Sequence, residues 1–137
     1  MRLPAACPEI PVADLPASLA YYRDRLGFTI DWADEGLGLA GLSRGDTRLF
    51  MANEDYRSWR GNKGPLLLWI NLDDRAEVDA LYRLWAEAGA EIEGPPGPKP
   101  YFLYEFFARD PDGNTLRVFY DFGWEEREAA DKPALSL

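Results

Sequence analysis

The side chains that could do chemistry in this chain are few in type, because it has no histidine and one cysteine, Cys7. A histidine-based zinc site, a Ser-His-Asp triad, a Cys-His dyad and an intrachain disulfide are therefore excluded. The usual group for proton transfer near neutral pH is also missing. Any catalysis would use carboxylates, tyrosine, lysine, arginine or Cys7. With no histidine to activate it, Cys7 is expected to be an inert buried thiol.

Aromatic side chains next to carboxylates form a second chemical pattern. Asp31 precedes Trp32, and a run of aromatic residues precedes Glu105. Aromatic residues make up 14% of the chain, so some rings are expected to line a pocket or an interface. Such a surface suits planar or cationic molecules through stacking and cation–π contacts. Tyr104 and Glu105 could form an acid–base pair, or be plain surface residues.

The charge is strongly acidic and unevenly distributed. The net charge is −9, of which residues 1–68 carry −1 (8 basic, 9 acidic) and residues 69–137 carry −8 (7 basic, 15 acidic). Nucleic-acid binding is disfavoured, because phosphate needs a basic surface. A cationic ligand would be attracted, although acidic charge can also serve solubility alone. No apolar run is long enough for a signal peptide or a membrane span, which predicts a cytoplasmic protein.

The elements that must position these side chains follow from hydrophobic periodicity and turn residues. One helix is expected between Asp14 and Gly27, and a second between Asp74 and Gly89. A rigid proline-rich loop is expected at residues 94–100. Short apolar runs bounded by turn residues predict eight strands at 5–13, 28–33, 36–43, 47–52, 66–72, 90–93, 101–108 and 115–121.

The same order of elements occurs twice, which indicates an internal repeat. At offsets of 60 and then 68 residues, the matches are Ile10 with Ile70, Asp14 with Asp74, Tyr22 with Tyr82, Arg23 with Arg83, Gly45 with Gly113 and Thr47 with Thr115. The sequence predicts one α+β domain over 1–137, with tandem βαβββ modules at 5–60 and 65–122 and an acidic tail at 123–137. The modules are expected to form a curved, eight-stranded mixed sheet with the helices outside.

Two stretches carry a resemblance to a known family. They are Ile-Pro-Val-Ala-Asp-Leu-Pro-Ala-Ser-Leu-Ala-Tyr-Tyr-Arg-Asp-Arg-Leu-Gly-Phe at 10–28 and Glu-Phe-Phe-Ala-Arg-Asp-Pro-Asp-Gly-Asn-Thr-Leu at 105–116. With the repeat, they resemble the glyoxalase/bleomycin-resistance/dioxygenase superfamily, or vicinal oxygen chelate proteins, over about residues 5–122. The resemblance implies the same two-module fold. It says little about function, because the superfamily contains both metalloenzymes and metal-free binding proteins.

The metal site of the superfamily's enzymes can be checked by position. The resemblance implies ligands, mostly His and Glu, on the first and last strand of each module. The matching positions here are Cys7, Leu49, Leu67 and Arg117. Two of these have no donor atom, and a protonated arginine repels a cation. The chain is therefore predicted to hold no metal and no cofactor, which favours a binding protein over an enzyme.

What remains is an aromatic hollow that resembles the bleomycin-resistance branch. Members of that branch are metal-free dimers that sequester a cationic, metal-chelating glycopeptide antibiotic between subunits. Asp31-Trp32 and Tyr101-Phe102 fall near the branch's stacking positions, whereas residues 102–104 differ from its Trp-Gly-Arg segment. The candidate ligand-binding residues are Asp31, Trp32, Leu49, Leu67, Trp69, Asn71, Tyr101, Phe102, Tyr104, Glu105, Arg117 and Phe119.

Simpler roles stay open for three of these candidates. Trp69 and Phe119 are as often core rings as pocket rings. Arg117 either pairs with Glu9 or Glu105 across strands or binds an anion.

The sequence thus predicts a metal-free homodimer that binds and sequesters a small planar or cationic compound, for which an antibiotic is one candidate. Two alternatives stay open. One is a lyase or dioxygenase-type enzyme of the same superfamily with a non-standard site. The other is a protein–protein interaction module whose aromatic surface meets a partner. Pro8 and Pro11 would permit the dimer to exchange its N-terminal strands.

Overall fold

The computed structural model describes residues 1–58 and 60–131, and these residues contain the two expected modules. Module one comprises β1 (Glu9–Pro11), α1 (Leu15–Asp24), β2 (Thr29–Asp34), β3 (Leu39–Arg44), β4 (Thr47–Ala52) and the short helix α2 (Glu54–Arg57). Module two comprises β5 (Leu67–Asn71), α3 (Arg75–Glu87), β6 (Glu91–Pro98), β7 (Leu103–Arg109) and β8 (Thr115–Asp121), and the acidic tail begins with helix α4 (Gly123–Asp131). Residue 59 of module one and residues 132–137 of the acidic tail lie outside the described residues.

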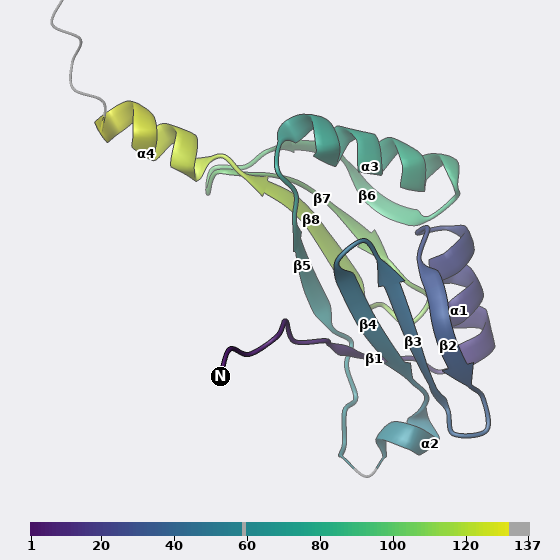
Figure 1. Cartoon of the computed structure of the whole chain (residues 1–137). Coiled ribbons are helices and arrows are strands. Elements are labelled where there is room, and N and C mark those ends of the chain that lie inside the picture. Colours follow the sequence, from purple (N-terminus) through teal and green to yellow (C-terminus); the bar gives the residue numbers. More distant parts are fainter. Residues whose placement is uncertain (59, 132–137) are drawn as a thin grey trace, which may run out of the picture.

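The eight strands form two four-stranded mixed sheets. Their orders are β1-β4-β3-β2 and β5-β8-β7-β6. In each sheet the first and last strands of the module pair in parallel, and the other pairs are antiparallel. Figure 1 shows the two sheets next to each other, with α1 and α3 along their outer side. The predicted α+β fold with tandem βαβββ modules and helices outside is therefore confirmed, with four strands in each sheet.

Both long helices begin at the aspartates that the sequence indicates. The Asp14 carboxylate accepts the backbone N–H of Ala17 at 3.0 Å, and the Asp74 carboxylate accepts that of Glu77 at 2.8 Å. Glu77 in turn accepts the backbone N–H of Asp73 at 3.0 Å, which completes a reciprocal cap. Each cap satisfies donors that a helix start leaves unpaired.

A side chain of each module also donates a hydrogen bond to a backbone carbonyl just after the long helix of the other module. Trp85 of α3 donates its indole N–H to the carbonyl of Leu26, 2.9 Å away, just after α1. Arg25 donates to the carbonyl of Ala88, 2.8 Å away, just after α3. Buried residues of the two modules form one continuous core, which includes Trp85. The two modules therefore share one core.

The turn before β8 joins the modules through buried polar groups. Asp110 is 3% exposed and Asn114 is 0% exposed. The Asp110 carboxylate accepts the Tyr22 hydroxyl of α1 at 2.8 Å and the Asn114 backbone N–H at 2.9 Å. The Asn114 side-chain amide donates to the carbonyl of Pro11 in module one, 2.9 Å away. A segment that reads as a simple turn in the sequence therefore holds the domain together.

The proline-rich segment differs from its predicted form. Residues 94–98 belong to β6 and were expected to form a loop. The pairing of β6 with β7 is irregular between Glu93 and Gly97 and resumes with Gly97 opposite Glu105. Since β6 is the outer strand of its sheet, a missing proline N–H there costs no bond to a further strand. Among the described residues, no helix has the length and apolar character needed to cross a membrane.

Candidate functional site

The side of each sheet that faces away from the helices carries most of the candidate residues, and we call it the open face. Residues directly opposite each other on paired strands share a face. In module two the open face comprises Leu67, Trp69, Asn71, Glu105, Phe107, Thr115, Arg117 and Phe119. In module one it comprises Glu9, Trp32, Gly41, Ser43, Arg48 and Phe50.

The pairing corrects one predicted position. Met51 lies opposite Ile10 in module one, and Val118 lies opposite Ile70 in module two, so β4 and β8 match at an offset of 67 (118 − 51) and not 68. The residue that matches Arg117 is therefore Phe50. Leu49, which was predicted there, is 2% exposed and packs in the core. A one-residue shift turns a strand side chain to the opposite face.

Arg117 forms a buried ion pair at the centre of the open face. Its Nε donates to Oε2 of Glu105 at 2.7 Å and its Nη2 donates to Oε1 at 3.1 Å. The Glu105 side chain is 0% exposed and that of Arg117 is 15% exposed. The Tyr101 hydroxyl donates to Oε1 of Glu105 and accepts Nη2 of Arg117 at 3.2 Å. Of the roles considered for Arg117, pairing with Glu105 is the one that the structure shows.

The hydrogen bonds to Glu105 favour the protonated forms of Tyr101 and Arg117. The hydrogen bond to Glu105 raises the pKa of the Tyr101 phenol above its ordinary value. The hydrogen bond to the same carboxylate raises the pKa of the Arg117 guanidinium. Tyr101 is therefore neutral and Arg117 charged near neutral pH, so neither is ready to accept a proton.

Aromatic rings surround the Arg117 guanidinium. Its Cζ lies 4.2 Å from the ring centroid of Trp69, 5.3 Å from that of Phe107 and 5.5 Å from that of Tyr101. Trp69 also meets Phe119 edge to face, with the centroids 5.4 Å apart. More than half of Trp69 stays exposed, at 56%. The indole of Trp69 thus contacts the Arg117 guanidinium, and its exposed part is accessible to a ligand.

Two cavities are bordered by candidate residues of the open face. One of about 280 Å³ lies between β4 and β5; its lining includes Arg48, Trp69 and Asn71, and the N-terminal segment adds Ala6 and Pro8. Another of about 130 Å³ is bordered by Asp31, Trp32, Gly41, Leu42, Arg48, Leu49 and Phe50. Arg48 borders both. Among the described residues, the Arg48 guanidinium takes part in none of the ion pairs or hydrogen bonds.

Comparison with known proteins gives the family. Residues 5–118 match the profile of the Glyoxalase/Bleomycin resistance protein/Dioxygenase superfamily. The chain belongs to this superfamily.

Solved structures of the superfamily include two bleomycin-binding proteins that are similar to this chain. One, from the bleomycin-producing Streptomyces verticillus in complex with copper(II)-bleomycin, is 30% identical, with 86% of this chain and 96% of that chain covered and a TM-score of 0.66. The other, in complex with bleomycin, is 27% identical, with 86% and 98% covered and a TM-score of 0.67. A lactoylglutathione lyase from Agrobacterium tumefaciens is 25% identical, with 90% and 98% covered and a TM-score of 0.68.

The residues at the superfamily's metal positions do not fit a metal ion. With the corrected pairing, these positions are Cys7, Phe50, Leu67 and Arg117. Phe50 and Leu67 have no donor atom, and Arg117 brings its own positive charge to Glu105, the nearest carboxylate. Within the described part of the chain, no three acidic or cysteine side chains gather closely enough to hold a metal ion.

The structure brings seven predicted candidates of module two together, whereas Tyr104 points away from them and Phe102 packs against Phe122. Leu67, Trp69, Asn71, Glu105, Arg117 and Phe119 share the open face, and Tyr101 reaches it from the β6–β7 turn. Tyr104 points the other way and donates its hydroxyl to Asp79 of α3 at 2.6 Å. The suggested Tyr104–Glu105 acid–base pair is therefore wrong, because neighbouring strand residues face opposite sides. Glu105 is also buried and not a surface residue.

In module one, Trp32 and Asp31 border the smaller cavity. The Trp32 indole lies across Gly41, where a Cβ would come 2.5 Å from its Nε1, so a larger residue at this position would displace the indole. Sequence reasoning missed Phe50 and Phe107, although strict alternation with the correct pairing would have found both. It also missed Arg48, for which the sequence carries no signal, because Trp69 and Asn71, which line the larger cavity with it, come from the other module.

The turn that carries Tyr101 and Phe102 is fixed by the end of β8. Phe102 adopts a left-handed backbone with φ +68°, which a non-glycine residue enters only under constraint. The constraint is a hydrogen bond from the Phe122 N–H to the Phe102 carbonyl at 3.0 Å. The two rings also meet edge to face, 5.8 Å apart.

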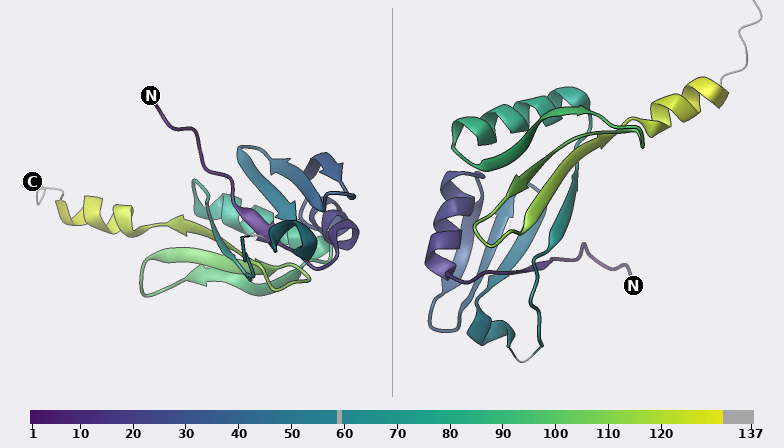
Figure 2. Two further views of the ribbon diagram at one scale, coloured as in Figure 1. Left: turned by 90° about the horizontal axis from the view of Figure 1, so that it is seen from below. Right: turned by 180° about the vertical axis from the view of Figure 1, so that it is seen from behind.

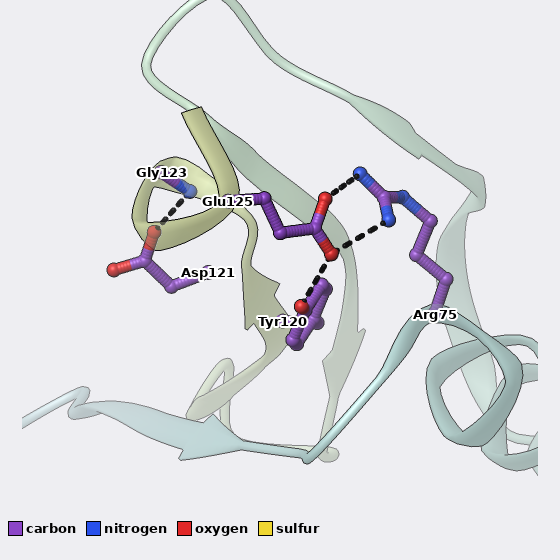
Figure 3. Close-up of polar contacts among 5 residues, drawn as sticks. All are labelled: Arg75, Tyr120, Asp121, Gly123 and Glu125. Atoms are coloured by element: carbon purple, nitrogen blue, oxygen red, sulfur yellow. Dashed lines mark hydrogen bonds and ion pairs between the residues drawn. The ribbon is translucent and has the colours of Figure 1, made fainter. Parts of the chain in front are cut away.

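Next to Phe122, a cluster of polar side chains joins the first turn of α4 to α3 and β8 (Figure 3). Both Glu125 oxygens accept the Arg75 guanidinium at 3.2 Å, and Glu125 also accepts the Tyr120 hydroxyl at 2.6 Å. The Arg75 Cζ lies 4.8 Å from the Phe122 ring centroid. Helix α4 projects away from both sheets (Figures 1 and 2), so this cluster at its first turn is its main attachment.

We expect the attachment of α4 to weaken in acid. The hydrogen bonds from Tyr120 and Arg75 lower the pKa of Glu125 below its ordinary value. The stabilisation is therefore present above the ordinary glutamate pKa, roughly 4.3, and is lost as the pH falls through the lowered value. The ¹³Cα shifts of Ala129 and Ala130 should move toward random-coil values in that range.

The substitution Glu125→Gln should produce the same loss at neutral pH. Glu126→Gln, on the same turn and exposed, is the matched control and should leave the shifts helical. If α4 keeps its helical shifts in Glu125→Gln at pH 7, the cluster does not hold the helix.

Proposed function

We propose that this protein is a metal-free member of the superfamily that binds a small planar molecule on the open face and sequesters it without converting it. The observation that carries the proposal is the buried Arg117–Glu105 pair at a metal position. An arginine there supplies a fixed charge but no exchangeable coordination site. The exposed Trp69 ring beside it supplies the area for stacking.

The two bleomycin-binding proteins support a sequestering role. They are 30% and 27% identical to this chain over 86% of its length. An antibiotic or a similar planar compound is the proposed ligand, with Trp69 and Trp32 as stacking surfaces. The similarity to the lactoylglutathione lyase supports the enzyme as second candidate. Metal analysis of the purified protein separates the two, because stoichiometric zinc, nickel, manganese or iron would overturn a metal-free binding role.

A homodimer in the cytoplasm completes the proposal. Strand β5 is paired on one side only, and Leu67 and Trp69 on it are 50% and 56% exposed. An edge strand with large exposed apolar side chains is typical of an interaction surface. Sedimentation should therefore give twice the chain mass of 15.5 kDa.

The binding proposal is tested with metal-free bleomycin and tryptophan fluorescence. We expect saturable quenching in the wild type. Trp69→Ala should weaken binding by about tenfold, because loss of one stacked ring costs roughly 1–1.5 kcal/mol. Leu84→Ala removes an equally exposed apolar side chain, 54% accessible on α3, and should leave the affinity unchanged. Equal affinities of wild type and Trp69→Ala would remove Trp69 from the site.

A further inference from the structure

Few of the chain's carboxylates lie in the larger cavity beside Trp69. Of the carboxylates near the open face, Glu105 is neutralised by Arg117. Asp31 accepts the Ser43 hydroxyl at 3.0 Å and Glu9 accepts the Asn62 amide at 2.8 Å; both keep their charge, but neither lines the larger cavity. The carboxylate of Asp46 remains, at the edge of the larger cavity. The net charge of −9 is therefore a poor guide to the charge of the ligand.

The inner face of Trp69 is already occupied by a cation. The Arg117 Cζ lies 4.2 Å from its ring centroid, and the exposed remainder of the indole is where a ligand would stack. A cation on the outer face would share the electron-rich ring with Arg117 and repel its charge across it. An uncharged or anionic ring meets no such repulsion. The stack therefore disfavours a cationic ring at Trp69.

A second guanidinium lies in the wall of the same cavity as Trp69. Arg48 borders that cavity with Asn71, and it takes part in none of the ion pairs or hydrogen bonds among the described residues. A guanidinium presents paired N–H donors that match a carboxylate. Arg48 is thus available to a negatively charged group of a ligand that stacks on Trp69.

We propose that the site selects a planar aromatic carboxylate, with the ring stacked on Trp69 and the carboxylate bound by Arg48. This inference rests on the proposed function and narrows its ligand from small planar molecules in general to planar anions. Asn71, in the same wall, is placed to hydrogen-bond the ligand beside Arg48. Asp46 at the rim opposes the anion, so its neutralisation should strengthen binding.

Three naphthalene probes of matched size test the charge preference. They are 2-naphthoate, 2-naphthamide and 2-naphthylmethylammonium, titrated against protein labelled with 5-fluorotryptophan and followed by ¹⁹F NMR. The Trp69 resonance is assigned by its loss in Trp69→Phe. We expect 2-naphthoate to bind about tenfold more tightly than the ammonium probe, with the amide between them.

Variants of Arg48 test the role of its side chain. Arg48→Gln should weaken 2-naphthoate binding about tenfold and leave 2-naphthamide unchanged, Arg48→Lys should restore part of the loss, and Asp46→Asn should tighten 2-naphthoate binding. Arg83→Gln, which removes an exposed arginine on α3, is the control and should change neither affinity.

The outcomes separate this inference from the proposed function. If 2-naphthamide shifts Trp69 but the ammonium probe binds as tightly as 2-naphthoate, or if Arg48→Gln weakens both neutral and anionic probes equally, only the anion preference is wrong. If no probe shifts the Trp69 resonance, Trp69 is not a stacking surface, and the proposed function and this inference fail together.

Discussion

Replacing Arg117 by methionine should destabilise the fold by about 3–5 kcal/mol, because it leaves the Glu105 carboxylate buried without its counter-charge. The Glu105 side chain is 0% exposed, and two of its three hydrogen bonds come from Arg117. The remaining bond from Tyr101 cannot neutralise a charge. The loss should be measurable as a lower free energy of unfolding in urea at pH 7.

A double variant shows whether the buried charge is the cause. Glu105→Leu with Arg117→Met replaces the pair by apolar groups and should recover most of the loss at pH 7. If Arg117→Met lowers the free energy of unfolding by less than about 1 kcal/mol, the Arg117–Glu105 pair does not stabilise the fold at the metal position.

The fold was predictable because local signals agree with each other along the whole chain. Asp14 and Asp74 each mark a helix start at the same place in a repeat, and the repeat predicts the pairing of first and last strands. Pairing of Arg117 with Glu105 was among the predicted roles, because both belong to neighbouring strands of one module. These features depend on residues close in sequence or on alternation within a strand.

The wrong choice of Leu49 arose because the alternation of side chains between the two faces had to be counted across a turn. Matching Gly45 with Gly113 aligns two turns, but the strand ladders after them differ by one residue, which exchanges Leu49 for Phe50. The Tyr104–Glu105 error has a different cause, because these two residues are adjacent within β7 and therefore fall on opposite faces. Arg48 could not be predicted at all, since its proximity to Trp69 exists only after two modules pack together.

The packing of the modules on each other should depend most strongly on Asn114. Its side chain donates to the carbonyl of Pro11 and to the Asp110 carboxylate, each at 2.9 Å, and accepts the Leu66 N–H at 2.8 Å. Asn114 is 0% exposed, so Asn114→Ala leaves the Pro11 carbonyl and the Leu66 N–H without this partner, whereas the Asp110 carboxylate keeps the Tyr22 hydroxyl. Each such group costs about 1–3 kcal/mol, which predicts a total loss of roughly 3–4 kcal/mol.

Asn53→Ala separates this effect from the loss of any asparagine hydrogen bond. Asn53 accepts the Tyr56 N–H at 3.0 Å to begin the short helix α2 and contacts nothing in module two through a hydrogen bond among the described residues. Its removal should cost about 1 kcal/mol, as for an ordinary helix cap. Both variants are compared with wild type by urea unfolding, followed by fluorescence and by far-ultraviolet circular dichroism.

The shape of the unfolding transition shows whether Asn114 joins the modules or merely stabilises one of them. Wild type should unfold in one transition with both probes, because one core and the Trp85–Leu26 bond run between the modules. If Asn114 is the main polar connection between modules, the fluorescence and circular dichroism midpoints of Asn114→Ala should separate. A single coincident transition, lowered by less than in Asn53→Ala, would mean that the apolar core alone holds the two modules together.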